Sequence, residues 1–228
     1  MNTAKIIAVT QPLIRVENTV SGMMEPLSVG EFIAYVARVS NPANQNNTLT
    51  SQKLLKYLAK NKHWSPFEMV NVVVEINTTR DIARQILRHR SFSFQEFSQR
   101  YADPTKDLGY EIREARLQDT KNRQNSVEVD DDELKFSWNA AQLRVAMLAE
   151  RTYKWAIEQG IAKEQARVVL PEGLTLSKIY MNGTLRSWIH YCQLRMANGT
   201  QKEHQNIAKE CWEEIIKYFP DLKDIQIN

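Results

Sequence analysis

The stretch RHRSFSFQEFSQR, residues 88 to 100, gathers residue types that bind charged and planar ligands. Its cations and aromatic side chains are Arg88, His89, Arg90, Phe92, Phe94, Phe97 and Arg100. A guanidinium group binds phosphate through paired hydrogen bonds and stacks on aromatic rings. Three phenylalanines this close together cannot all face solvent without exposing a large apolar patch. The stretch therefore predicts a pocket for an anion with a flat ring, such as a nucleotide or a flavin, in which Ser98 and Arg100 bind phosphate.

Helical spacing upstream adds more positive charge to this region. Arg80, Arg84 and Arg88 are four residues apart and are expected to share one face of a helix over residues 81–90. Like charges at this spacing destabilise a helix by a few tenths of a kcal/mol. Asp81 is the only nearby acid in the sequence to offset them. Because the charges adjoin both an apolar stripe and the phenylalanines, we interpret them as part of a binding site.

The elements that must position this site follow from periodicity and turn residues. Alternating Val70, Val72, Val74 and Ile76 predict a strand with one apolar face. Strands are expected at 5–10, 69–76 and 174–181. Helices are expected at 30–39, 49–60, 81–90, 130–159, 185–197 and 201–218, with a further short helix that ends near residue 170. Residues 12–26 and 63–68 are expected to be loops, and 102–129 a polar, irregular and mobile surface segment. The pattern predicts one mixed α+β domain over residues 1–228.

Two helix starts carry recognisable signals. The acidic run from Asp130 to Glu133 complements the dipole at the start of a long helix, which we prefer to a metal site. Thr200 and Glu203 have the spacing of a capping box for the last helix.

Composition excludes several classes of protein. The net charge of +3 is mild for a dedicated nucleic-acid binder, and two cysteines allow no disulfide framework. The seven glycines form no G-x-G-x-x-G or P-loop, and the four histidines never pair at metal-ligand spacing. No apolar run approaches about 18 residues, so we expect a cytoplasmic protein without a metal or a membrane partner.

A nucleic-acid-binding module is the main alternative from another class. It draws on the basic stretch, the interleaved phenylalanines and the five tryptophans. Against it, four tryptophans are expected to lie on the buried faces of helices: Trp138, Trp155, Trp188 and Trp212.

Several motifs resemble one known family. Arg88-His89-Arg90, seven residues and Ser98 reproduce the RHR-x7-S signature of the flavin-dependent thymidylate synthases. Further blocks resemble the family in the same order along the chain: residues 37–40 (ARVS), 63–68 (HWSPFE), 166–171 (ARVVLP) and 185–195. Five ordered blocks are hard to reach by chance, so the chain is identified as similar to this family.

The resemblance implies an activity and an assembly. Members methylate dUMP to dTMP, taking a methylene group from methylenetetrahydrofolate and a hydride from tightly bound FAD, which NADPH reduces again. It also implies a central, mainly antiparallel sheet with flanking helices, in a homotetramer whose active sites are shared between subunits.

The resemblance also assigns residues by position. The residues expected to contact FAD are Ser40, His63, Ser65, Glu68, Arg88, His89, Arg90, Thr184, Arg186 and His190. Those expected to contact dUMP are Gln85, Arg88, Glu96, Ser98, Gln99, Arg100, Arg167 and Arg195. Segment 96–100 is expected to serve dUMP from a neighbouring subunit. Where many members have a histidine near the flavin, this chain has Gly199.

Arg195 is the residue expected to act in the chemistry. It falls at the edge of the apolar stripe of its helix, where an arginine can also simply extend from the core to solvent. The resemblance places it against the uracil ring, where a fixed guanidinium stabilises developing negative charge. Cys192 and Cys211 fall among apolar residues, so we expect core positions and no cysteine nucleophile.

Overall fold

A four-stranded antiparallel sheet forms the centre of the molecule. We describe residues 3–17 and 22–223 of a computed structural model of the chain. The strands are β1 (Thr3–Val9), β4 (Asn71–Thr79), β8 (Leu176–Thr184) and β5 (Ser93–Glu96), and they lie in the order β1-β4-β8-β5. Every neighbouring pair is antiparallel. The expected mixed fold around a mainly antiparallel sheet is therefore confirmed.

The two central strands alternate between a buried and an open face. Val72, Val74 and Ile76 of β4 are fully buried, as are Ile179 and Met181 of β8. On the other face, Glu75 and Lys178 are partly exposed and form an ion pair of 3.6 Å. The alternating valines that predicted β4 thus point into the core.

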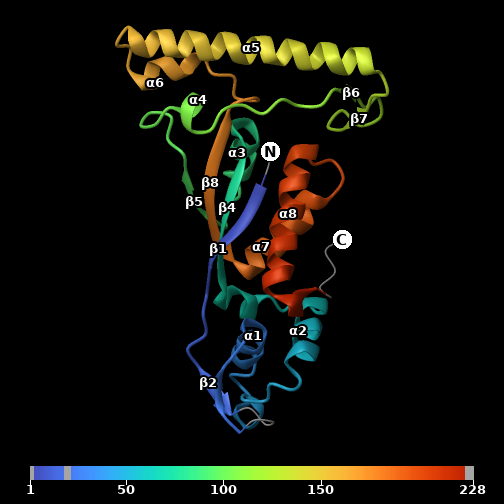
Figure 1. Cartoon of the computed structure of the whole chain (residues 1–228). Coiled ribbons are helices and arrows are strands. Elements are labelled where there is room, and N and C mark those ends of the chain that lie inside the picture. Colours follow the sequence, from blue (N-terminus) through green and yellow to red (C-terminus); the bar gives the residue numbers. More distant parts are fainter. Residues whose placement is uncertain (1–2, 18–21, 224–228) are drawn as a thin grey trace.

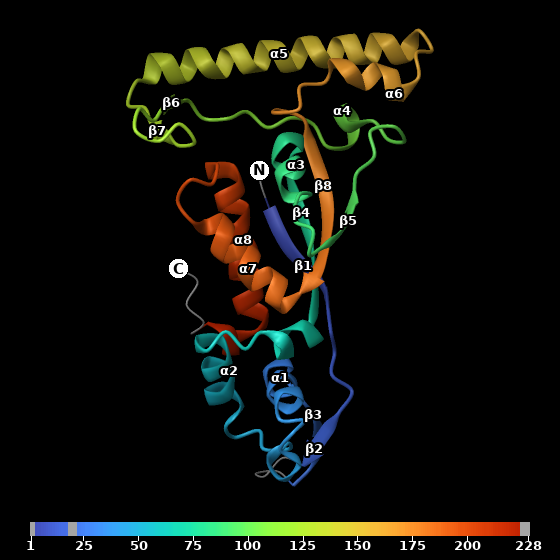
Figure 2. The same cartoon turned by 180° about the vertical axis from the view of Figure 1, so that it is seen from behind.

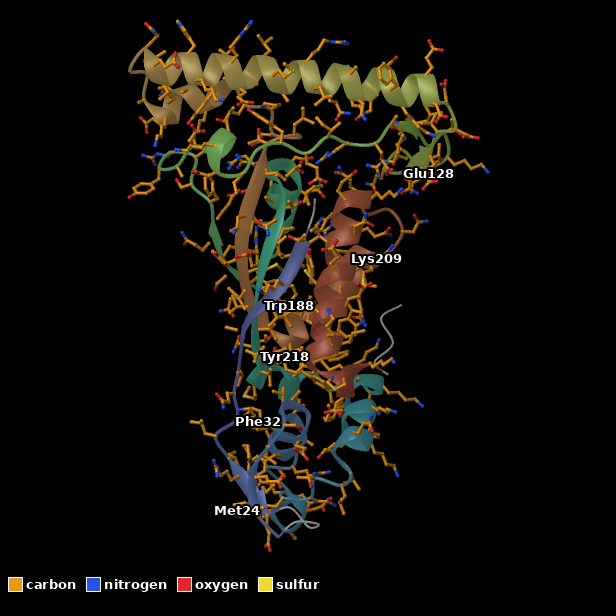
Figure 3. The ribbon with its side chains drawn as sticks, in the orientation of Figure 1. Met24, Phe32, Glu128, Trp188, Lys209 and Tyr218 are labelled. Carbon is orange, nitrogen blue, oxygen red and sulfur yellow. The ribbon has the colours of Figure 1, made fainter. Side chains whose placement is uncertain are left out.

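Helices α7 (Leu185–Met196) and α8 (Lys202–Tyr218) cover the apolar face of the sheet. Figure 1 shows both helices packed beside β1 and β4. Trp188 lies at the centre of this layer, and its indole Nε1 donates to the carbonyl of Val72 at 3.0 Å (Figure 3). Cys192 and Cys211 are buried in the same core, as expected from the sequence.

A smaller layer lies at the end of the molecule away from α5. It contains α1 (Val29–Ala37), α2 (Ser51–Lys60) and the hairpin of β2 (Arg15–Glu17) with β3 (Met24–Pro26). A capping box between Ser28 and Glu31 starts α1. Short 3-10 turns cover 42–44, 65–69 and 220–222.

At the opposite end, the long helix α5 (Asp132–Glu158) crosses over the tip of the sheet (Figure 2). Asp131 caps it, and Asp132 and Glu133 lie in its first turn, so the acidic run acts as expected. Around it lie α3 (Arg80–Ile86), α4 (Pro104–Asp107), α6 (Lys163–Ala166) with a 3-10 turn at 167–169, and the hairpin of β6 (Arg116–Gln118) with β7 (Ser126–Glu128). No helix within the described ranges is both long and apolar enough to cross a membrane.

Several expected elements differ in the structure. Residues 12–26 contain the paired strands β2 and β3, with 18–21 outside the described residues. Residues 65–69 form a 3-10 helix, and 102–129 hold α4 and the β6–β7 hairpin. Helix α3 ends at Ile86, so Arg88 lies in a turn beyond it. The phenylalanine-rich segment forms the edge strand β5 because it pairs with β8. A strand that forms by pairing with residues far away in the sequence leaves little signal in its own sequence.

The expected capping box at the start of α8 is wrong. Gln201 is the N-cap and makes no side-chain cap. The Thr200 hydroxyl lies 3.5 Å from the carbonyl of Leu194, and the Glu203 carboxylate accepts from Arg116 instead. A buried cation competes better for a carboxylate than one backbone N–H does.

Two tryptophans expected in the core are also exposed. Trp138 and Trp155 of α5 are 46% and 55% exposed, whereas Trp188 and Trp212 are buried. The elements packed against α5 cover only some of its apolar side chains. Sequence periodicity cannot reveal which side chains are covered.

Gly183 allows Phe92 to pack on the end of β8. A Cβ atom at Gly183 would lie 2.3 Å from Cδ1 of Phe92. We expect Gly183→Ala to lower the free energy of unfolding by about 1–3 kcal/mol, because the ring must leave its place against Trp188. Urea unfolding followed by tryptophan fluorescence measures this.

Gly173→Ala is the matched control, because a Cβ there meets nothing within 4 Å. It is expected to change stability by less than about 0.5 kcal/mol. Equal effects of the two substitutions would show that Phe92 does not depend on Gly183.

Candidate active site

A hydrogen bond joins the basic motif to the last turn of α7. Nε of Arg195 donates to Nε2 of His89 at 2.9 Å, across 106 positions of sequence. Burial first, and the charge of Arg195 second, lower the pKa of His89 to about 4. His89 is therefore neutral at neutral pH and can accept this bond. The bond fixes the guanidinium plane of Arg195, which a side chain merely extending to solvent would not require.

Aromatic rings hold His89 from several sides. Its ring centroid lies 4.9 Å from that of Tyr191, 6.3 Å from that of His204 and 6.4 Å from that of Phe92, each in edge-to-face geometry. Phe92 also contacts Trp188 at 4.9 Å. Phe92 thus supports His89 from the core, so this ring is a packing residue rather than an open stacking surface.

The arginines before the motif are mostly paired. Arg80 is buried and lies 3.5 Å from Glu96, and Arg84 pairs with Glu172 at 2.8 Å. The sequence offered only Asp81 to offset these charges, but carboxylates from β5 and from the turn before β8 reach Arg80 and Arg84. Arg88 and Arg90 are exposed and have no ion pair within the described chain.

A second group of expected site residues lies at the start of α7. Arg186 donates to the Glu68 carboxylate, and the ring of His190 lies 5.0 Å from that of Trp64. Burial and the charge of Arg186 lower the pKa of His190. Thr184 caps α7 by accepting from the Ser187 N–H at 3.2 Å. Helix α7 therefore has Arg186 and His190 near its start and Arg195 in its last turn.

His63, Ser65 and Ser40 are exposed outside these clusters. His63 makes an edge contact with Tyr57 at 6.1 Å, and Ser40 follows the end of α1. None of the contacts described here brings them to Arg195.

A third group surrounds a cavity of about 430 Å³ beyond β5. It is lined by Ser98, Arg100, Tyr101, Ala162, Lys163 and Glu164. Arg100 and Glu164 form an exposed ion pair of 3.3 Å. Arg167 donates to the carbonyl of Glu164 at 3.3 Å. The structure thus brings Ser98, Arg100 and Arg167 together, near the side chains of α6.

Two residues expected to line the nucleotide site have side chains directed into the protein: Glu96 is hydrogen-bonded there, and Gln99 is buried. Glu96 accepts from Ser177 at 2.8 Å as well as lying beside Arg80. Gln99 is 4% exposed, and its Nε2 atom is buried without a hydrogen-bond partner.

Sequence reasoning missed a polar network next to His89. Gln85 donates to Gln201 at 2.8 Å, and its side-chain oxygen lies 3.1 Å from Nδ1 of His204. The available signal was a histidine within the apolar stripe of α8, where Ile207, Ala208 and Cys211 are all buried. The described residues contain no group of three or more His, Cys, Asp and Glu that could hold a metal ion.

The fold matches that of a nucleotide methylase. A UMP/dUMP methylase, PolB from Streptomyces cacaoi, solved with 5-Br dUMP, superposes with a TM-score of 0.75 at 21% identity, covering 100% of this chain and 97% of the other. The two chains therefore share one mixed α/β fold.

The sequence comparisons define the family. The family model of the thymidylate synthase complementing protein matches residues 27–221. The chain is 47% identical over 220 residues to the probable flavin-dependent thymidylate synthase of Paramecium bursaria Chlorella virus 1, covering 96% of both chains. It is 48% identical over 218 residues to the flavin-dependent thymidylate synthase of Synechocystis sp., again covering 96% of both. This protein belongs to the family of flavin-dependent thymidylate synthases.

The buried histidines make stability depend on pH. The pKa values of His89 and His204 in the folded chain are about 4 and about 3, against 6.5 for a free histidine. As pH falls below about 6.5, the unfolded chain binds protons that the folded chain does not, so the free energy of unfolding decreases. We expect urea midpoints to fall between about pH 7 and about pH 5.

The variant His89→Gln removes one of these groups. Its midpoint should fall less than that of the wild type over the same pH range. An identical loss in both proteins would mean that folding does not lower the pKa of His89.

Proposed function

We propose that this chain converts dUMP to dTMP, with methylenetetrahydrofolate as the carbon donor and FAD, reduced by NADPH, as the hydride source. The observation that carries the proposal is the bond between Arg195 and His89. It unites the signature motif of the family with its late arginine in one cluster. We further propose that residues 1–228 act as one domain in the cytoplasm.

The charges of this chain fit an anionic dinucleotide. Arg88 and Arg90 are exposed, and neither is paired within the described residues, so both can bind the phosphate groups of FAD. Arg186 and His190 are one turn apart and share a face at the start of α7, where they add a cation and a histidine to this set. When bound, FAD supplies the hydride that completes the methyl group.

Arg195 is proposed to act on the uracil ring. Its Nε atom is committed to His89, which leaves the terminal nitrogens of the guanidinium to face a ligand. The uracil ring attacks a carbon electrophile as its ionised form, in which negative charge lies on the carbonyl oxygens. A cation whose orientation is already fixed stabilises this charge without reorganisation. His89 therefore serves as the acceptor that aims Arg195.

The proposed dUMP phosphate site comprises Ser98, Arg100 and Arg167. None of the contacts described joins these residues to Arg195, which supports a site completed by another subunit. Exposed apolar side chains along α5 support the same assembly: Leu134, Phe136, Trp138, Leu143, Val145, Met147, Leu148 and Trp155 are all at least 40% exposed. Exposed apolar surface of this extent is typical of an interface between copies of a chain.

Visible absorbance of the purified protein is the first test. A yellow protein that NADPH bleaches anaerobically, and that forms dTMP when dUMP and methylenetetrahydrofolate are added, supports the proposal. A colourless protein that takes up no added FAD contradicts it. The nucleic-acid alternative is then the reading to pursue, by measuring salt-dependent binding to single-stranded DNA.

Substitution of Arg195 separates chemistry from flavin binding. We expect Arg195→Ala to lower dTMP formation by at least about a hundredfold, in line with the loss of a single preorganised donor. The flavin absorbance per subunit should stay close to that of the wild type, because other residues bind FAD. Wild-type rates of dTMP formation in this variant would show that Arg195 has no catalytic role.

The proposed tetramer can be tested on α5. Leu148 is 57% exposed, and a carboxylate in its place should be costly to bury between subunits. We expect Leu148→Asp to shift the mass measured by light scattering from four subunits to fewer, with loss of dTMP formation. Lys53→Asp on the exposed side of α2 is the control for added negative charge. A tetramer unaffected by Leu148→Asp would place the interface elsewhere.

A further inference from the structure

A buried histidine lies where α3, α7 and α8 meet. His204 in the first turn of α8 is 0% exposed. Its Nδ1 atom lies 3.1 Å from Oε1 of Gln85, and its Nε2 atom lies 3.1 Å from the hydroxyl of Tyr191. Both ring nitrogens are therefore engaged. A buried polar group that is fully partnered fixes the orientation of its neighbours.

In the chain of hydrogen bonds that leads from Gln85 to Glu203, each amide has one fixed donor and one fixed acceptor side. Nε2 of Gln85 donates to Oε1 of Gln201 at 2.8 Å, and Nε2 of Gln201 donates to Oε2 of Glu203 at 2.9 Å. The other oxygen of Glu203 accepts from Arg116. An ionised carboxylate can only accept, so Glu203 fixes the orientation of Gln201 and turns its amide oxygen towards Gln85. A flipped Gln201 would place its oxygen against the carboxylate.

The orientation of the Gln85 amide determines which ring nitrogen of His204 carries the proton. Because the nitrogen of Gln85 faces Gln201, its oxygen faces His204, and Nδ1 must carry the proton. Nε2 then accepts from the Tyr191 hydroxyl. Burial above all, and the charge of Arg195, keep the pKa of His204 at about 3, so the ring is neutral at neutral pH. Its single proton holds the amide of Gln85 in one orientation.

We propose that His204 is a positioning residue that makes Gln85 present an N–H group, and not its carbonyl, to the nucleotide. The second amide hydrogen of Gln85 has no partner among the described residues. The dUMP atom that meets Gln85 must then be an acceptor oxygen, and a donor at that position is rejected. This inference rests on the proposed function and on the contact of Gln85 with dUMP that the family resemblance implies.

Two substitutions of matched chemistry test the role of His204. The amide nitrogen of asparagine can occupy the place of Nδ1, whereas that of glutamine reaches the place of Nε2. His204→Asn is therefore expected to keep the bond to Gln85, with a KM for dUMP within about threefold of the wild type. His204→Gln loses this bond, and its KM for dUMP should rise roughly tenfold.

Further readouts separate positioning from general damage. In both variants the flavin absorbance and the kcat at saturating dUMP should change much less than the KM for dUMP. Gln85→Ala removes the amide that His204 orients, so adding His204→Gln to Gln85→Ala should raise the KM little further, as expected for two coupled residues. In the wild type, ¹⁵N NMR of the ring should show a protonated Nδ1 and an unprotonated Nε2.

The outcomes are distinguishable from those of the proposed function. A wild-type protein that binds no flavin and forms no dTMP overturns the proposed function and this inference with it. An active wild type in which both substitutions raise the KM equally overturns the inference alone. A proton found on Nε2 also overturns it, whatever the kinetics show.

Discussion

The antiparallel pairing of β4 with β8 places the other parts of the site. Asn71 pairs with Thr184 at one end of the pair, and Thr79 pairs with Leu176 at the other. Because the strands run in opposite directions, α3 begins at one end of the sheet and α7 begins at the other. Twelve residues of α7 then extend for about 18 Å back along the sheet. Its last turn therefore reaches the segment that follows α3, where Arg195 meets His89.

The elements that could be predicted are those with a strong local period. The valines of β4 and the apolar stripes of α7 and α8 each identify an element from a few neighbouring residues. Strand β5 could not be predicted, because its pairing with β8 spans about 85 positions and its residues also suit a turn. The exposure of Trp138 and Trp155 was equally hidden, since a periodic stripe does not reveal which of its residues have neighbours to cover them.

The residues proposed for the site were chosen from motifs in the sequence, but their arrangement could not be read from it. Spacing identified the motif of Arg88, His89 and Arg90 and the late Arg195, yet nothing local indicates that Arg195 donates to His89. The role of His204 was less visible still, because its bonds come from α3 and α7.

Charge pairing across the fold selects which cations remain for a ligand. The sequence shows a row of arginines with one acid nearby, but Glu96 and Glu172 reach Arg80 and Arg84 from distant segments. The pair with Glu96 holds the buried Arg80 inside the fold, whereas Arg84 and Glu172 form a half-exposed pair. Arg88 and Arg90 are exposed and have no ion pair within the described residues. The helix-like spacing of the arginines is therefore an incidental feature, whereas the short motif after α3 keeps its charge.

Arg100, in the segment that follows β5, is paired by an exposed and therefore weak ion pair with Glu164. The side chains of Arg100 and Glu164 are 67% and 50% exposed, and an ion pair this open contributes about 0–1 kcal/mol. A phosphate group forms two charge-assisted hydrogen bonds with a guanidinium, which are stronger. In the proposed site, a ligand phosphate would therefore displace Glu164 from Arg100 at little cost. The open pair thus fits the proposed role of Arg100, because it holds the side chain beside Ser98 without binding it strongly.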